Sequence, residues 1–179
     1  MIEIFKNIFK NCLTQYGNQF VGTNQHDLQE FLSCFLTALD TELNEIGFKI
    51  IQELFFGVTF ISYTCQQCHC TSQTSDPFSI LNLQVPSKQS SMTIEQCLDL
   101  YGDEEELNEW PCENNCKATT KHKMRIIFDK LPNILLVRVK ISNNSNETQI
   151  KFKEMLRIKH VKFELIGVVC HRNVLSRKF

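Results

Sequence analysis

The chain has 179 residues and a formal net charge of -1 at pH 7. Because domains that bind nucleic acid through its phosphates usually carry a clear basic excess, this charge balance argues against a nucleic-acid partner. Hydrophobic residues make up 42% of the chain and include fourteen phenylalanines. That content is enough for the hydrophobic core of one ordinary domain, or of a portion of a larger one.

The N-terminus carries no recognisable targeting signal. The first ten residues mix charged and apolar side chains, which is typical neither of a signal peptide nor of a membrane span. No later apolar run approaches the length needed to cross a bilayer. We therefore expect no membrane association and an intracellular, reducing compartment, in which cysteines stay available as thiols.

Two amphipathic helices are predicted in the first part of the chain. Apolar residues recur at helical spacing over residues 1–16, and Cys12 lies on that apolar face, so we interpret it as a buried core thiol. A longer helix is predicted from about Gln25 to Glu45, with Thr23 or Asn24 as its N-cap.

The remainder of the chain predicts mainly β-structure, with one short helix capped by Thr93. The predicted strands cover residues 55–64, 71–85, 117–128, 133–141 and 161–170, with polar connections at 87–91 and 142–148. The acidic run 103–106 is expected to be a solvated face or a helix start. These elements predict an α+β fold with a helical first half and a mostly antiparallel sheet.

Two pairs of closely spaced cysteines are the strongest chemical signal in the chain, Cys65-x-x-Cys68 and Cys112-x-x-x-Cys116. Thiolates at such spacing project from tight turns, so two turns brought together can present four sulfur ligands to a tetrahedral Zn²⁺. We therefore predict a structural zinc site shared by two distant segments. Cys70 adds an ambiguity, because Cys68-x-Cys70 could replace one member of the first pair.

Three other interpretations of these cysteines fit the sequence less well. A redox Cys-x-x-Cys motif needs a helix that starts at the pair, whereas Cys65 follows a strand-like run. Disulfides are disfavoured because the chain has nine cysteines, an odd number, and no secretory signal. The third alternative is four unrelated thiols that simply pack, and the short spacing within both pairs argues against it.

Several blocks of the sequence, in a fixed order, resemble the ubiquitin-specific proteases. The segment Gln25-His26-Asp27-Leu28-Gln29-Glu30-Phe31 is similar to the Gln-Gln/His-Asp-x-Gln-Glu-Phe motif of that family. Further similar blocks are Phe20-Val21-Gly22, Leu54-Phe55-Phe56-Gly57, Pro77-Phe78-Ser79-Ile80-Leu81-Asn82-Leu83, Thr93-Ile94-Glu95-Gln96-Cys97-Leu98, Leu131-Pro132-Asn133-Ile134-Leu135 and Phe163-Glu164-Leu165-Ile166-Gly167-Val168-Val169-Cys170-His171, together with the two cysteine pairs. The second pair departs from the family, with three intervening residues where two are usual.

The resemblance implies a papain-like cysteine protease fold with a helical thumb, an antiparallel β palm and zinc-tipped fingers. Residues 1–179 would form a partial domain of this kind, with part of the thumb in 1–54 and the fingers and palm in 55–179. The family activity is the thiol-dependent cleavage of ubiquitin from proteins, which needs a nucleophilic cysteine, a histidine base and an Asp or Asn that orients the imidazole.

The family's catalytic cysteine box and its Gly-Gly-His-Tyr block have no counterpart in the 179 residues, so we assign no catalytic residue. His171 matches a non-catalytic histidine of the family. For His26, His69, His122 and His160 we expect ordinary surface or structural roles. We therefore expect a fragment or an inactive form that binds ubiquitin.

The resemblance also implies a binding role for the acidic residues of the Gln-His-Asp motif, which in the family face the arginine-rich tail of ubiquitin. They correspond to Asp27 and Glu30, which lie three residues apart and hence on one face of a helix. The alternative role for both residues is a helix cap and a first-turn charge. An alternative function for the whole chain is a non-catalytic zinc-ribbon module with an unrelated protein partner.

Overall fold

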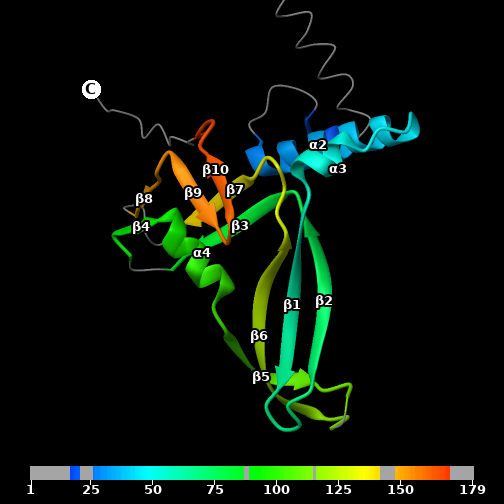
Figure 1. Ribbon diagram of the computed structural model, residues 1–179, viewed down its shortest axis with the longest axis vertical. Helices are drawn as coiled ribbons and strands as arrows, with labels where there is room; N and C mark the ends of the chain where they lie inside the picture. The colour runs from blue at the N-terminus through cyan, green and yellow to red at the C-terminus, as the bar shows by residue number, and fades with distance from the viewer. Residues whose placement is uncertain (1–16, 21–25, 87–88, 115, 142–147, 170–179) are drawn as a thin grey trace, which may run out of the picture.

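The computed structural model describes residues 17–20, 26–86, 89–114, 116–141 and 148–169. Its most prominent feature is a long, narrow sheet that extends away from a body of helices and short strands (Figure 1). Helices α2 and α3 lie at the end of this sheet opposite to the tip that β5 joins. The predicted helix over 1–16, with Cys12, lies outside the described residues, as does His171.

Helix α2 covers Leu28–Glu45, close to the predicted span, but its N-cap differs from the prediction. Asp27 is the cap, not Thr23 or Asn24, and its side chain accepts hydrogen bonds from the backbone N–H groups of Gln29 at 2.7 Å and Glu30 at 3.4 Å. A carboxylate is a strong N-cap because it satisfies amides that have no partner in the first turn and also favours the helix dipole. The helix therefore begins inside the Gln-His-Asp motif.

Helix α3, Ile50–Phe55, has no counterpart among the predicted elements, and its last residue, Phe55, is where a strand is predicted to start. Six residues are too few to display a helical repeat, and the residues that follow it are aromatic and β-branched. The chain reaches α3 through Gly47, whose φ of 84° suits a glycine. Gln52 of α3 donates a hydrogen bond to Asp40 of α2 at 2.9 Å, which joins the two helices.

The long sheet contains four antiparallel strands in the order β2-β1-β6-β5. The bounds are Gly57–Cys65 for β1, Thr71–Phe78 for β2, Glu105–Pro111 for β5 and Thr119–Lys130 for β6. The acidic run was expected to be a solvated face or a helix start; it is exposed, and part of it forms the beginning of β5. We call these four strands the finger sheet.

The predicted strand 71–85 is in fact two strands that belong to different sheets. After Ser79, β3 (Ile80–Val85) leaves the finger sheet and pairs in parallel with β7 (Leu136–Ile141). The change of environment explains the break, because β2 is polar and exposed whereas β3 alternates between buried and exposed residues. A continuous run of β-compatible residues conceals such a division.

The rest of the body consists of short elements around helix α4, Ile94–Gly102, whose capping box pairs Thr93 with Gln96 as predicted for a Thr93 cap. Strand β4 (Ser91–Thr93) pairs in parallel with β8 (Gln149–Lys151), and β9 (Met155–Ile158) forms a hairpin with β10 (Val161–Glu164). The predicted last strand therefore ends at Glu164 rather than at 170. The pairings β3–β7 and β4–β8 are parallel, whereas the three pairings of the finger sheet and the β9–β10 hairpin are antiparallel, so the expectation of a mostly antiparallel sheet is confirmed.

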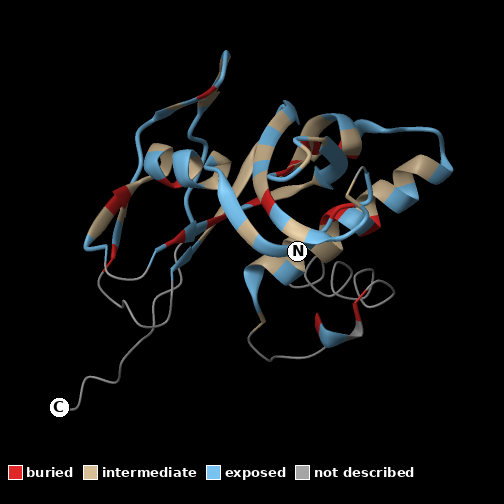
Figure 2. Cartoon of the chain, turned by 90° about the horizontal axis from the view of Figure 1, so that it is seen from below, coloured by how far each residue is buried: buried red, intermediate tan, exposed pale blue. Residues whose placement is uncertain are grey.

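The hydrophobic core lies between β3, β4 and α4. It is formed by the buried side chains of Leu81, Leu83, Val85, Met92 and Cys97, and partly buried residues of β6, β7 and β8 pack against it. In Figure 2 the buried residues form short separate segments rather than one continuous stretch. We call this part the palm.

No helix in the described part of the chain is long and apolar enough to span a membrane.

Candidate metal centre and acidic helix start

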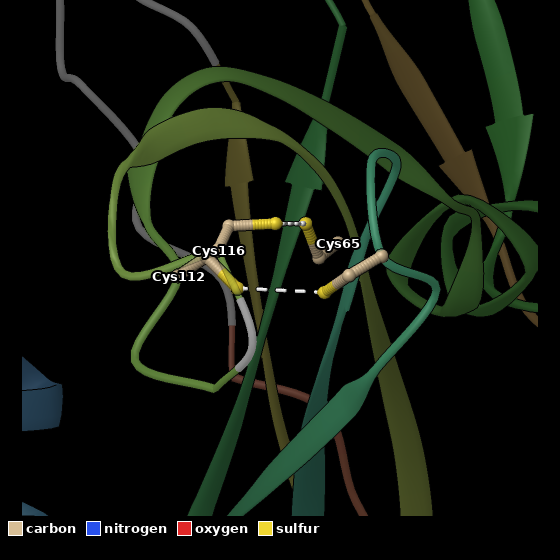
Figure 3. A group of neighbouring side chains, drawn as sticks. Cys65, Cys112 and Cys116 are labelled. Atoms are coloured by element: carbon tan, nitrogen blue, oxygen red, sulfur yellow. Dashed lines mark hydrogen bonds between the residues drawn. The ribbon is translucent and has the colours of Figure 1, made fainter.

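Four cysteine sulfurs converge at the tip of the finger sheet. The Sγ atoms of Cys65, Cys68, Cys112 and Cys116 all lie within 4.8 Å of one another. Cys65 ends strand β1, whereas Cys116 precedes β6, and their sulfurs are 3.8 Å apart; those of Cys68 and Cys112 are 3.7 Å apart (Figure 3). The fold thus brings together the two pairs that are distant in the sequence.

The distances between the sulfurs fit tetrahedral coordination. With a Zn–S bond of about 2.3 Å, two ligands of a tetrahedral zinc lie about 3.8 Å apart. A disulfide would need sulfurs about 2.05 Å apart, and the described cysteines are unbridged. A redox motif would need a helix at the first pair, but the chain continues from that turn into β2. The cluster can hold a metal ion.

The two turns that carry the cysteines have matching backbones. The residue after the second cysteine has a positive φ in each turn, 58° for His69 and 48° for Lys117. In each turn the first cysteine donates its N–H to the carbonyl of the residue that follows the one with positive φ. Cys65 donates to Cys70, and Cys112 donates to Ala118. Cys70 therefore occupies the position of Ala118 in the other turn, which explains why it lies outside the four-sulfur cluster.

The surroundings of the sulfurs favour ionised thiols at some positions and oppose them at others. A hydrogen bond with the Thr120 hydroxyl at 3.2 Å, together with N–H groups of Cys68 and Gln67, lowers the pKa of Cys65 to about 5. Burial and the neighbouring sulfurs raise the pKa of Cys116 to about 12. Four thiolates this close repel one another, and a divalent cation removes that repulsion.

A half-buried threonine and a buried histidine lie beside the cluster, where only an ordinary surface or structural role was expected for the histidine, His122. His122 lies opposite Cys65 in the β1–β6 register and is only 4% exposed. Its Nδ1 atom lies 3.2 Å from the carbonyl oxygen of Thr120 and 3.4 Å from the Thr120 hydroxyl, which in turn contacts Cys65. Side chains alternate between the two faces of a strand, so the sequence of β6 could have indicated that His122 points inward. Only the pairing of β6 with β1 places His122 next to Cys65.

The other described histidines lie apart from the cluster or outside its ligand set. His26 packs edge-on against Phe20, with ring centroids 5.3 Å apart. His69 follows the second cysteine of its turn and is exposed, and His160 is exposed between β9 and β10.

The two predicted ubiquitin-binding acids lie at the start of α2. Glu30 is exposed in the first turn. Asp27 caps the helix with Oδ1, while its Oδ2 forms an ion pair with Nη2 of Arg138 at 3.0 Å. Arg138 belongs to β7, so this ion pair links the helix start to the palm, and the sequence analysis had not anticipated it.

Comparison with known proteins assigns the family. The family model "Ubiquitin carboxyl-terminal hydrolase" matches residues 3–178. The chain belongs to this family. The structure agrees with the α+β fold expected from the resemblance, in which a finger sheet ends in a four-cysteine cluster.

Individual relatives are more distant. The chain is 30% identical over 165 residues to ubiquitin carboxyl-terminal hydrolase 2 of Gallus gallus. This match covers 74% of this chain and 46% of the relative. It is 25% identical over 167 residues to ubiquitin carboxyl-terminal hydrolase 21 of Arabidopsis thaliana, covering 88% of this chain and 22% of the relative. The chain thus spans less than half the length of these relatives.

Solved structures share the fold. The SAGA DUB module of Ubp8, Sgf11, Sus1 and Sgf73 bound to monoubiquitin contains a chain with a TM-score of 0.75 and 24% sequence identity, and the match covers 92% of this chain and 41% of that one. The Ubp8/Sgf11/Sus1/Sgf73 module bound to ubiquitin aldehyde matches with a TM-score of 0.64 and 22% identity, over 82% of this chain and 35% of that one. At this identity the similarity establishes the fold.

Proposed function

We propose that this chain is the ubiquitin-binding part of a deubiquitinase domain, with fingers that are stabilised by one zinc ion. The four-sulfur cluster at the tip of the finger sheet is the observation that carries the proposal. Family membership and the two ubiquitin-bound modules with the same fold support ubiquitin as the partner. A reducing, intracellular compartment fits a site that requires unbridged thiols.

Zinc would have a structural role. Cys65, Cys68, Cys112 and Cys116 would be its four ligands, which leaves no open position for a water or a substrate, as is typical of structural sites. The ion would neutralise the crowded thiolates and hold together two turns, one between β1 and β2 and the other between β5 and β6. Thr120 would hold the Cys65 sulfur in its ionised form through its hydroxyl.

Asp27 and Glu30 would contact the arginine-rich tail of ubiquitin. The exposed carboxylate of Glu30 is accessible to a guanidinium group, and the N-terminal position in α2 stabilises its negative charge. Asp27 has a second role as the cap that sets where the helix begins, so it also positions Glu30.

We further propose that these 179 residues bind ubiquitin without cleaving it. The four clustered cysteines would be committed to the metal. Cys97 is 1% exposed, and burial raises its pKa, both of which oppose a role as a nucleophile. Hydrolysis of a ubiquitin–fluorophore conjugate by the purified chain would contradict this part of the proposal.

Titration of labelled protein with ubiquitin tests the partner. We expect binding in the micromolar range or tighter, with Glu30→Gln weakening it by about threefold to tenfold, because one charge-assisted contact is lost. Glu45→Gln is the matched control, since Glu45 is an exposed acid at the opposite end of the same helix. Absence of binding at high micromolar ubiquitin would favour the alternative, a zinc-ribbon module with an unrelated partner.

A further inference from the structure

We infer that Arg138 competes with the arginines of the ubiquitin tail for the carboxylate of Asp27, and so sets how tightly the tail is bound. This inference rests on the proposed role of Asp27 in ubiquitin binding. It assigns a function to Arg138, a palm residue that neither the cysteine pairs nor the Gln-His-Asp motif points to.

The carboxylate of Asp27 already forms an ion pair with a guanidinium group of this chain. Nη2 of Arg138 lies 3.0 Å from Oδ2 of Asp27. The two residues are 111 positions apart in the sequence, so the fold and not a local constraint brings them together. Oδ1 of the same carboxylate accepts the two N–H groups of the helix start. Both oxygens of Asp27 therefore have partners before any ligand arrives.

The contact between Arg138 and Asp27 has the same chemistry as the contact proposed between Asp27 and an arginine of the ubiquitin tail. An arginine of the ubiquitin tail would approach Asp27 with the same planar guanidinium group that Arg138 presents. If Arg138 stays in place, the incoming arginine meets a neutralised carboxylate and a like charge beside it. If Arg138 is displaced, its ion pair must be broken first. In both cases the internal arginine weakens tail binding.

The ion pair is open enough to be exchanged. The side chains of Arg138 and Asp27 are 39% and 43% exposed, so the contact is reached by solvent and its net strength is small. A buried pair would resist displacement, whereas an exposed one contributes a moderate penalty that a ligand can overcome. Glu30, three residues further on, offers an exposed acid that remains available while Arg138 holds Asp27.

Removal of the competitor is the direct test. In ubiquitin titrations with the full chain, Arg138→Gln is expected to tighten binding by about twofold to fivefold, the range expected for one exposed ion pair. Arg157→Gln is the matched control, because it removes one positive charge from an exposed position on β9. It is expected to leave the affinity unchanged.

A double-mutant cycle separates competition from a structural role. Asn is also a strong N-cap, so Asp27→Asn keeps the helix start while it removes the charge, and it should weaken ubiquitin binding. In that background Arg138→Gln should tighten binding less than it does in the wild-type chain, since there is no carboxylate left to compete for and only the repulsion between the two positive charges is removed. The tightening seen in the single variant should also shrink as salt is raised.

The outcomes distinguish this inference from the proposed function. If the wild-type chain binds ubiquitin but Arg138→Gln weakens binding or leaves it unchanged, Arg138 supports the site or is neutral, and competition is wrong. Tightening of the same size in the Asp27→Asn background as in the wild-type chain would also overturn it. If no variant binds ubiquitin, the proposed function fails, and the inference fails with it.

Discussion

The finger tip and the palm are stabilised in different ways. The palm has a conventional apolar core, in which Leu81 and Leu83 are 1% and 0% exposed. The buried residues at the finger tip are instead Cys65 and Cys112, which belong to the four-sulfur cluster, and His122, which lies opposite Cys65. The difference indicates that hydrophobic burial stabilises the palm, whereas the finger tip depends on its sulfur cluster and, under the proposed function, on the zinc ion that the cluster would hold.

Loss of the metal should have the largest effect, and it should be confined to the fingers. Structural zinc sites contribute roughly 10 to 16 kcal/mol of apparent binding free energy, so Cys112→Ser or a strong chelator should unfold the tip. We expect one zinc per wild-type chain by mass spectrometry of metals and faster amide exchange in β1 and β6 of the variant. Protection in β3 and α4 should persist.

Cys70→Ser is the matched control for the cysteine substitution, since Cys70 lies outside the ligand set. It should retain the zinc. Acidification should also release the ion. Metal binding lowers the pKa of the thiols, so they stay ionised below the pKa of a free thiol, and the ion is lost once the pH falls far enough for protons to compete for the sulfurs. If the wild-type finger sheet is stably folded without metal, the finger tip does not depend on a metal, and the proposed difference between fingers and palm is wrong.

A cavity in the palm should have the next largest effect on stability. It should destabilise the palm and leave the zinc site of the fingers intact. Leu83→Ala removes a fully buried side chain from the core and should cost about 2 to 5 kcal/mol of unfolding free energy. Urea denaturation would measure the loss, and zinc content should stay at one per chain. Gln84→Ala, at the exposed neighbouring position of β3, should change the stability little. Loss of zinc from Leu83→Ala would show that palm and fingers unfold together.

A backbone change in one cysteine turn should have the smallest effect, and it should act on zinc affinity alone. Lys117 adopts φ 48°, a left-handed conformation that costs a residue with a Cβ about 1 kcal/mol. Lys117→Gly should relieve that strain and lower the dissociation constant for zinc by about threefold in a chelator competition assay. Lys121→Gly, in the extended conformation of β6, should not improve zinc binding and should weaken the strand.

The sequence allowed a good prediction of those elements whose signals are local. The start of α4 followed from Thr93, and the body of α2 followed from its long apolar repeat. Predictions were wrong where the signal depended on surroundings. The division at Ser79 between β2 and β3 is decided by which sheet each half joins, and α3 is too short to show a period.

The candidate site divides in the same way. Spacing alone was enough to propose Cys65 with Cys68 and Cys112 with Cys116, but the position of Cys70 was settled by matching backbone hydrogen bonds in the two turns. The acids of the helix start were found through a motif. Their partner was not, because Arg138 reaches Asp27 through a contact between elements far apart in the chain.

By itself, the sequence determined the family resemblance, the residue types of a thiolate metal site and the approximate extent of the longest helix. Each of these depends on neighbours within a few residues, where spacing translates directly into geometry. Only the tertiary structure decided which four sulfurs meet, that Thr120 and His122 lie behind them, and that Arg138 occupies Asp27. Those facts depend on strand pairing and chain crossing, which bring together side chains whose separation in sequence carries no record of their contact.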